Sequence, residues 1–369
     1  MSRYDFFATA EERDLISLDK ALKDRELDLY NYMLLLHALD CRNDSSLARV
    51  AHKIAVHQKD RTKFLSRFSR NMVTDPGAAL DLMGKLGLLG IGNEGLEHLP
   101  SCAVVLEFEF VLEKNFLSRD DAPFYPIDNS VRKERIFRAP MISGSSWKGS
   151  LRAAAVDLLV LQELDLDRKM QERLALIEIF GDEKGEAEEG EEAGEQSLKA
   201  YLDNYLGEGK MKFEEEKKKR LGGASPEEAD ICRKGRVRCL PSYFNGIDLD
   251  VINPRSRKTR TGTVPIPMEM VPAGCAAKLG MIYLPFDLLG QEEAKIREQL
   301  RRDWNILGKA LFRMFRESGF GAKKTSGCGK AQMQISGFRF ECGMAGFKPP
   351  EVARLEGLTA LRNCFEVVL

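Results

Sequence analysis

Two segments of this 369-residue sequence carry residue types that could hold a phosphate group, and one of them also carries an aspartate that could act on it. In residues 127–152 a lone aspartate, Asp128, stands in a basic loop ahead of the small-residue turn Ser143-Gly144-Ser145-Ser146. The turn opens an expected helix that carries Lys148 and Arg152. Backbone N–H groups and the positive end of a helix dipole suit such a turn to a phosphate. An ordinary Ser-capped helix after a strand would produce the same pattern.

The second segment, residues 319–330, holds four glycines and three lysines between an expected helix and an expected strand. Glycines let the backbone approach a sugar-phosphate chain closely, and lysines neutralise its charge. The spacing differs from that of a P-loop or a dinucleotide-binding turn. A helix C-terminus followed by a hairpin turn would use similar glycines. The candidate contacts here are Gly319, Gly321, Lys323, Lys324, Gly327 and Gly329.

The formal net charge of −1 conceals a strong segregation of charge. Residues 182–195 carry eight acidic side chains and one lysine, a net of −7, so the rest of the chain carries about +6. Residues 128–152 have six basic and two acidic side chains, and residues 233–260 have eight and two. Such stretches suit a polyanionic partner, although a solvated charged face is the commoner origin of any single one. In the later stretch the candidate contacts are Arg236, Arg238, Arg255, Arg257 and Arg260.

Composition argues against several other classes of protein. The sequence has no run of 18 apolar residues and no apolar leader after Met1, so we expect a cytoplasmic protein that does not enter a membrane. The eight cysteines form no C-x-x-C pair, and all four histidines precede residue 100. We therefore expect reduced thiols and no zinc site.

Hydrophobic periodicity predicts an α+β fold. A strand is expected from Ala103 and a helix over residues 145–161, and with the loop between them they form the first half of a ferredoxin-like β-α-β unit. A strand at 276–286, an amphipathic helix at 292–317 and a strand at 331–340 are expected to follow.

The same reading divides the chain into regions. Residues 1–95 are expected to form a helical N-terminal region that ends in a glycine-rich boundary. Residues 101–345 are expected to form the core, interrupted by a flexible, charged surface insertion at 181–225 with one helix near 196–205. Residues 346–369 are expected to be a C-terminal extension.

Four stretches of the chain, taken together, resemble the RAMP superfamily, specifically the backbone (Csm/Cmr-type) subunits of type III CRISPR effector complexes. The aspartate loop and residues 142–152 are similar to the family's I-P-G-S-S-x-K-G-x-x-R element, and residues 179–181 to its short L-F-G element. Residues 236–274 resemble its central region, which ends in E-x-V-P-x-G, here Glu269 to Gly274. Residues 319–330 are similar to its glycine-rich loop. The sequence departs from the pattern at Ser143, Trp147 and Val264.

The resemblance implies an RRM-like core that holds a guide RNA (crRNA) through the three basic or glycine-rich regions. It aligns Asp128 with the aspartate that cuts paired target RNA, an endoribonuclease reaction for which a divalent metal such as Mg²⁺ is expected at Asp128. Asp120 and Asp121 are nearby acidic alternatives. The implied partners are crRNA, target RNA, other RAMP subunits and a large subunit of the complex.

Other functions stay open on the sequence alone. A RAMP subunit at an end of the complex would bind RNA without cutting it. A stand-alone RRM-like RNA-binding module is a further candidate, although the aromatic R-G-F-x-F strand motif of such modules is absent. A guide-processing endonuclease of the same superfamily usually relies on a histidine, and no histidine follows His98.

Overall fold

The computed structural model describes residues 76–92, 96–120, 129–182, 197–221, 234–252 and 266–366. Most of the expected N-terminal helical region, residues 1–75, lies outside these ranges, as do Asp128 and most of the acidic stretch. The chain divides into two compact units. Of the described residues, the first unit contains 76–82, 117–120, 129–141, 244–252 and 266–272. The second contains 83–92, 96–116, 142–182, 197–221, 234–243 and 273–366.

The larger unit is built on a four-stranded antiparallel sheet in the order β3-β7-β1-β8. Strand β1 forms because apolar residues alternate along it, and the residues Val104, Leu106, Phe108, Phe110 and Leu112 are all buried on one face. The strands are β1 (Val104–Leu112), β3 (Val237–Cys239), β7 (Ala276–Tyr283) and β8 (Ala331–Cys342).

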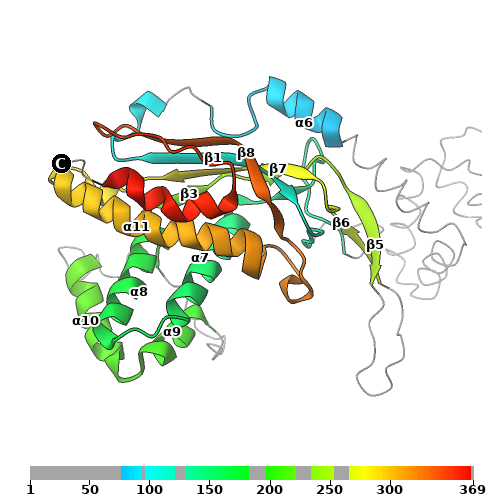
Figure 1. The fold of residues 1–369 in the computed structure, drawn as a ribbon. Helices are drawn as coiled ribbons and strands as arrows, with labels where there is room; N and C mark the ends of the chain where they lie inside the picture. Colours follow the sequence, from blue (N-terminus) through cyan, green and yellow to red (C-terminus); the bar gives the residue numbers. More distant parts are fainter. Residues whose placement is uncertain are drawn as a thin grey trace, which may run out of the picture. The chain divides into compact units, whose positions relative to one another are not determined.

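Two helices cover the apolar face of this sheet, α7 (Gly144–Val160) and α11 (Glu293–Arg313), as Figure 1 shows. Helix α11 continues into a short π-helix, η5 (Met314–Ser318). The chain order β1-α7-β3-β7-α11-β8, with β1 next to both β7 and β8, is the ferredoxin-like arrangement. The expected α+β, ferredoxin-like fold and each of its expected strands and helices are therefore confirmed.

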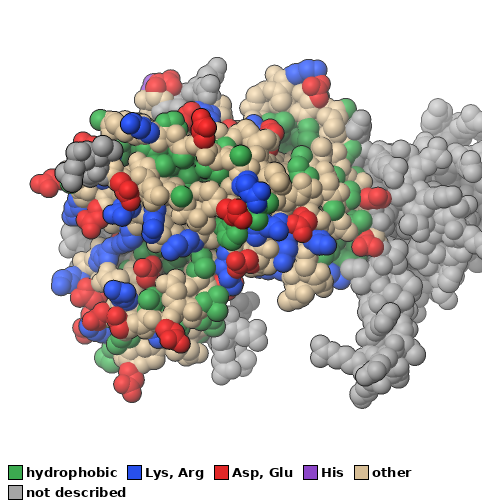
Figure 2. Space-filling model, viewed as in Figure 1, with side chains coloured by type: hydrophobic (Ala, Val, Ile, Leu, Met, Phe, Trp, Pro, Cys, Tyr) green, Lys and Arg blue, Asp and Glu red, His purple; other side chains and the backbone are tan. Residues whose placement is uncertain are grey.

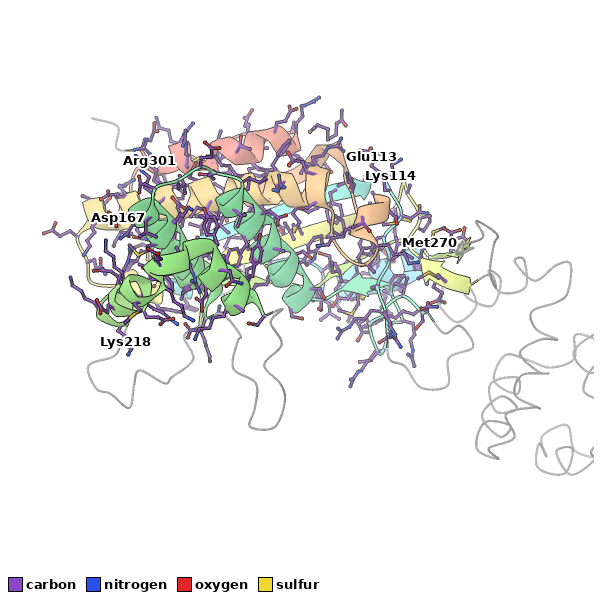
Figure 3. All side chains as sticks on the ribbon, turned by 90° about the horizontal axis from the view of Figure 1, so that it is seen from below. Glu113, Lys114, Asp167, Lys218, Met270 and Arg301 are labelled. Carbon is purple, nitrogen blue, oxygen red and sulfur yellow. The ribbon has the colours of Figure 1, made fainter. Side chains whose placement is uncertain are left out.

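A helical subdomain follows α7, formed by α8 (Leu166–Phe180), α9 (Leu198–Leu206) and α10 (Lys210–Leu221). Asp167 and Lys218, at its surface, are labelled in Figure 3. Its own core consists of Met170, Leu174, Ile177, Leu206 and Phe213. The helix expected near 196–205 is present as α9, but the expectation of a flexible insertion over 181–225 is wrong for residues 197–221, which pack around a core. A few well-spaced apolar residues suffice there to bury a face of two charged helices.

The C-terminal residues are part of the packed core instead of an appended extension. The 3₁₀ helix η7 (Leu355–Phe365) packs along α11 and buries Leu358, Leu361 and Phe365. Gly308 of α11 makes this possible, because a Cβ at that position would lie 2.1 Å from the carbonyl oxygen of Leu358.

In the smaller unit, β5 (Asp248–Ile252) and β6 (Ile266–Met270) form an antiparallel ladder in which Asp248 faces Met270 and Ile252 faces Ile266. The structure also contains helix α6 (Pro76–Lys85) and the short strands β2 (Met141–Ile142) and β4 (Ser242–Tyr243). Basic and acidic side chains are interspersed over the face drawn in Figure 2. Among the described residues, no helix combines the length and the apolar character needed to cross a bilayer.

The contact between α11 and η7 predicts the effect of a methyl group at Gly308. Gly308→Ala should lower the free energy of unfolding by about 1–3 kcal/mol, because backbone must move to admit the side chain. Gly149→Ala is the matched control, since a Cβ on that α7 glycine would meet nothing within 4 Å. It should stabilise the protein by up to about 1 kcal/mol through helix propensity. Urea unfolding of both variants tests this, and equal midpoints would contradict the packing described.

Candidate nucleic-acid interface

An aromatic cluster joins the beginning of α7 to the base of the glycine-rich loop. The side chain of Trp147 is 1% exposed, and its ring centroid lies 4.8 Å from that of Phe320 and 5.8 Å from that of Phe110. Phe315, in the π-helix η5 that continues α11, has its ring centroid 5.6 Å from that of Trp147 and 5.4 Å from that of Phe320. Two segments that are more than 170 residues apart in the sequence therefore share one buried floor.

A hydrogen-bond chain fixes the orientation of this floor relative to the sheet. The indole N–H of Trp147 donates to Ser242 Oγ at 2.8 Å, and the Ser242 hydroxyl donates to the carbonyl oxygen of Lys278 at 2.5 Å. A buried indole N–H without a partner would cost about 1–3 kcal/mol, so the position of the Trp147 ring is well determined.

The N-terminus of α7 is capped and held close to strand β3. Ser143 accepts a hydrogen bond at its Oγ from the Ser146 N–H at 3.2 Å, and its hydroxyl lies 2.9 Å from the hydroxyls of both Ser145 and Ser146. A Cβ at Gly144 would lie 2.1 Å from the carbonyl oxygen of Cys239, at the end of β3. The glycine therefore lets the first turn of the helix approach the strand.

This close approach gathers positive charge beside the helix N-terminus. The pKa of Lys148 is lowered, first by its partial burial and then by the nearby cations Arg238 and Arg152. Arg238 uses part of its guanidinium to donate to the carbonyl oxygens of Gly235 and Val237. The residues expected from two separate sequence stretches, Lys148 and Arg238, are thus brought together.

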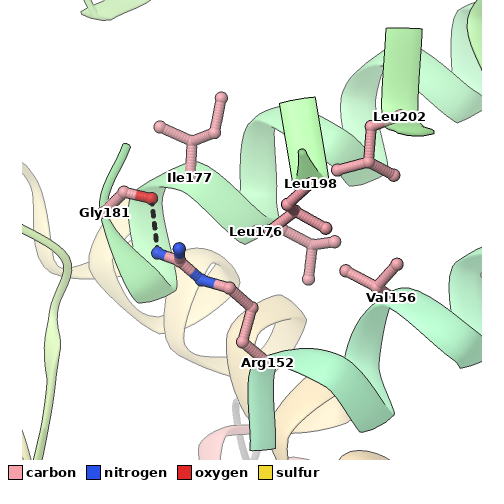
Figure 4. A pocket seen from close by; sticks show the side chains of 7 residues that line it. All are labelled: Arg152, Val156, Leu176, Ile177, Gly181, Leu198 and Leu202. Carbon is pink, nitrogen blue, oxygen red and sulfur yellow. Dashed lines mark hydrogen bonds between the residues drawn. The ribbon is translucent and has the colours of Figure 1, made fainter. Parts of the chain in front are cut away.

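The side chain of Arg152 forms its hydrogen bonds within the protein. Its Nη2 donates to the carbonyl oxygens of Phe180 and Gly181 at 2.6 and 2.7 Å, and its Nη1 donates to that of Asp182 at 3.3 Å. These oxygens follow the end of α8, where carbonyl groups lack helical partners. Figure 4 shows the side chain beside Gly181, where it lines a small cavity with apolar side chains. The geometry favours a capping role for Arg152 over the phosphate contact expected from the sequence.

The side chain of Arg236 is likewise bound by other residues in the protein interior. Its side chain is 4% exposed and donates to Asp303 Oδ2 at 2.6 Å and to Asp287 Oδ1 at 3.0 Å. Burial opposes its charge, but Asp287, Tyr283 and Asp303 outweigh that effect and raise its pKa. The expected RNA contact at Arg236 is therefore not supported by its position, which is that of a buried structural cation.

The glycine-rich loop has a buried base and an exposed tip. Phe320 N–H donates to the carbonyl oxygen of Gly329 at 2.9 Å, and Gly329 N–H donates to that of Asn115 at 2.8 Å. Gly329 has a φ of 69°, and a Cβ there would lie 1.8 Å from the Phe320 carbonyl oxygen, so only glycine fits. Between them, residues 322–326 are exposed and include Lys323 and Lys324. Of the other candidates, Gly319, Gly321 and Gly327 also have positive φ, whereas Arg255, Arg257 and Arg260 lie outside the described residues.

In the smaller unit, a buried carboxylate holds the chain just after the aspartate loop. Asp128 lies outside the described residues, but the carbonyl oxygen of Asn129 accepts from the Glu269 N–H at 3.0 Å. Glu269, fully buried, accepts from the Val131 N–H at 3.1 Å and pairs with Lys133. Sequence reasoning gave Glu269 and Lys133 no role of their own, because the partners are 136 residues apart.

The described residues contain no group of three or more His, Cys, Asp or Glu side chains that could hold a metal ion. Of the loop carboxylates, Asp121 and Asp128 fall outside these residues, and Asp120 falls within them. The backbone N–H of Asp120 donates to the carbonyl oxygen of Ser130 at 3.0 Å, so the beginning and end of the aspartate loop are joined.

Comparison with known proteins identifies the family of the chain. The family model described as RAMPs, the RAMP superfamily, matches residues 84–332, well over half of the sequence. The chain therefore belongs to the RAMP superfamily, and the resemblance inferred from its motifs is confirmed. No curated protein sequence matches it significantly.

Two solved structures are also similar to this chain. One is a chain of the cryo-EM structure of the type III-B Cmr-beta complex bound to cognate target RNA, at 13% identity and a TM-score of 0.42, covering 92% of this chain and 98% of that one. The other belongs to a CRISPR RNA-guided surveillance complex in a pre-nicking state, at 12% identity and a TM-score of 0.32, covering 63% of this chain and 77% of that one.

The aromatic cluster predicts a large effect of changing Trp147. Trp147→Leu should lower the free energy of unfolding by about 2–4 kcal/mol, because it leaves a cavity in the buried floor and removes the bond to Ser242. Tyr201→Leu is the matched control at a half-exposed aromatic residue of α9, for which we expect a change within about 0.5 kcal/mol. Denaturant unfolding measures both, and a Trp147 variant as stable as the control would show that this floor is not a stabilising core.

Proposed function

We propose that this chain is a guide-binding subunit of a type III CRISPR RNA-guided effector complex, in which Asp128 cuts target RNA paired with the guide. Membership of the RAMP superfamily supports the general assignment. The observation that carries the RNA-binding part is the shared aromatic floor, which brings the capped N-terminus of α7 and the glycine-rich loop onto one side of the core.

The physical basis for guide binding is electrostatic and steric. The first turn of α7 offers backbone N–H groups and the positive end of the helix dipole, and Lys148 and Arg238 add full charges beside it. Lys323 and Lys324 extend the basic surface from the exposed tip of the glycine-rich loop. Such contacts to phosphates would be independent of sequence, as a protein that accepts many different guides requires.

The cleavage part of the proposal rests on Asp128 and on the chemistry of RNA. The 2′-OH beside the scissile phosphate is an internal nucleophile, so the protein need only align it and assist its deprotonation. A divalent metal such as Mg²⁺, if held by Asp128, would supply charge stabilisation for the phosphate. Glu269 and Lys133 lie in the unit that contains the aspartate loop, and their ion pair would give that loop a fixed anchor.

Guide binding should depend on Lys148 and Arg238. Lys148→Glu combined with Arg238→Glu should weaken guide retention by at least about tenfold at moderate salt, since the pair forms direct phosphate contacts in this account. Arg168→Glu and Arg354→Glu, at exposed arginines of α8 and the C-terminal region, are controls of the same charge change. Filter binding across a salt series tests this, and an unchanged affinity and salt slope would remove the proposed contact.

The lowered pKa of Lys148 gives the same site a pH signature. The charged amine binds phosphate, so guide affinity should fall as the pH rises through this lowered pKa, below the ordinary value of 10.5. Lys148→Arg stays charged over the whole range and should keep its affinity at alkaline pH. Parallel binding curves for the two proteins measure the difference, and identical pH profiles would argue against Lys148 as a phosphate contact.

Cleavage should depend on Asp128 alone among the nearby carboxylates. In the assembled complex, Asp128→Asn should retain guide and target binding but reduce target cleavage by at least about a hundredfold, because the carboxylate acts in the transition state. Asp120→Asn and Asp121→Asn are the controls, and EDTA should stop the wild-type reaction. Full cleavage by the Asp128 variant would instead favour a non-cutting subunit at an end of the complex.

A further inference from the structure

Residues 132–141 of the smaller unit form a tight, well-defined turn. Its arms are joined by a bridge between Lys133 and Pro140 and by a bond from the Met141 N–H to the carbonyl oxygen of Arg132 at 2.8 Å. The Glu134 N–H donates to the Ala139 carbonyl oxygen at 2.9 Å. The turn is therefore closed along its whole length by backbone hydrogen bonds.

The Glu134 carboxylate accepts backbone hydrogen bonds from the residues at the tip of the turn. Glu134 Oε2 accepts from the N–H groups of Ile136 and Phe137 at 2.7 and 2.6 Å. The next residue, Arg138, has a φ of 58°, a left-handed conformation that non-glycine residues adopt rarely. Its N–H donates to the carbonyl oxygen of Glu134 at 3.1 Å. A turn that maintains this conformation is preorganised and would lose little entropy on binding.

The base of the turn is anchored in the interior of its unit. Lys133 pairs with the buried carboxylate of Glu269, and the side chains of Val131 and Ala139 are fully buried. Burial lowers the pKa of Lys133, and the neighbouring Glu269 opposes that effect. The turn is thus tied to strand β6, which carries Glu269, and its tip projects from a fixed base.

The exposed residues at the tip do not resemble an ordinary solvated turn. Ile136 is 80% exposed, the highest value among the large exposed apolar side chains of the described residues. Arg132, Arg135 and Arg138 of the same turn are also exposed, and none forms an ion pair with a carboxylate in the described part of the chain. Glu134, the only acidic residue of the turn 132–141, accepts the hydrogen bonds that close it.

We propose that this tip, residues 135–138, is a second RNA-contact site, in which Arg135 and Arg138 bind phosphates and Ile136 packs against a base or ribose. The inference rests on the proposed function and adds a site to it. Three exposed arginines and one exposed apolar side chain within one short turn fit a ligand with a charged backbone and apolar base faces. Arginines on phosphates beside an inserted apolar residue are a recurrent way to hold nucleic acid.

The position of the tip in the sequence indicates which RNA it meets. Arg135 is seven positions after Asp128, and an extended chain of that length spans at most about 25 Å. RNA that reaches Asp128 for cleavage must therefore pass within a few nucleotides of the tip. The ligand is the ribose-phosphate chain beside the cleaved bond, which comes from either the guide or the target strand.

Two variants test the site. Arg135→Gln combined with Arg138→Gln should reduce the magnitude of the salt slope of RNA binding by about 1.4, from about 0.7 for each lost contact to a single strand. Ile136→Ala should weaken binding about fivefold at every salt concentration without changing the slope, since it removes apolar contact only. Arg168→Gln with Arg354→Gln, and Leu161→Ala at a 67% exposed leucine, are the matched controls.

The measurements are guide loading without target and target capture by the guide-loaded complex, with melting temperatures to show that each variant is folded. A loss in either measurement supports the site, and the measurement in which it appears identifies the strand. Unchanged affinity and slope for both strands would overturn the inference. Loss of a copurifying protein subunit with RNA binding intact would also overturn it and assign the tip to protein docking. The proposed function fails separately, if Lys148 and Arg238 variants load guide normally.

Discussion

The packing of Trp147 against Phe320 is the contact on which the candidate interface depends. Their ring centroids are 4.8 Å apart, and both side chains are buried with Phe110 and Phe315. Because interiors pack densely, a shift of one ring would move both the first turn of α7 and the base of the glycine-rich loop. The two motifs, far apart in the sequence, therefore rest on one buried floor in this chain. Their small residues permit close approach, and the aromatic cluster fixes its geometry.

Buried ion pairs hold the elements that the aromatic cluster does not reach. In the larger unit, Arg236, which immediately precedes β3, pairs with Asp287 and with Asp303 of α11. Arg152 is not paired in this way, and donates to backbone carbonyl oxygens at the end of α8. In the smaller unit, Glu269 of β6 holds the chain that follows the aspartate loop. Removing one partner from such a pair leaves an uncompensated buried charge, which usually costs about 3–5 kcal/mol. The structure therefore gives Arg236 and Arg152 partners within the protein.

The sequence predicted the sheet and its covering helices well, because β1, α7, α11 and β8 each have a clear period and clear turn residues at their ends. It also predicted a helix at the position of α9, but it missed α10, where Phe213 provides a core within a charged helix and stacks with Arg173 at 4.2 Å. The sequence also could not show which basic side chains are buried in ion pairs and which are exposed and could bind RNA. Arg236 and Arg238 look alike in a basic stretch, and only the fold brings Asp303 to the first of them.

Site-specific photo-crosslinking of the guide tests the central claim most directly. A photoreactive uridine would be placed at successive single positions of a guide bound to the native complex, and the crosslinked peptides of this chain identified by mass spectrometry. The account predicts that neighbouring guide positions crosslink to residues 143–148 and to residues 322–326, because both segments rise from one aromatic floor. Crosslinks confined to α8–α10, or to only one of the two segments at all guide positions, would contradict it.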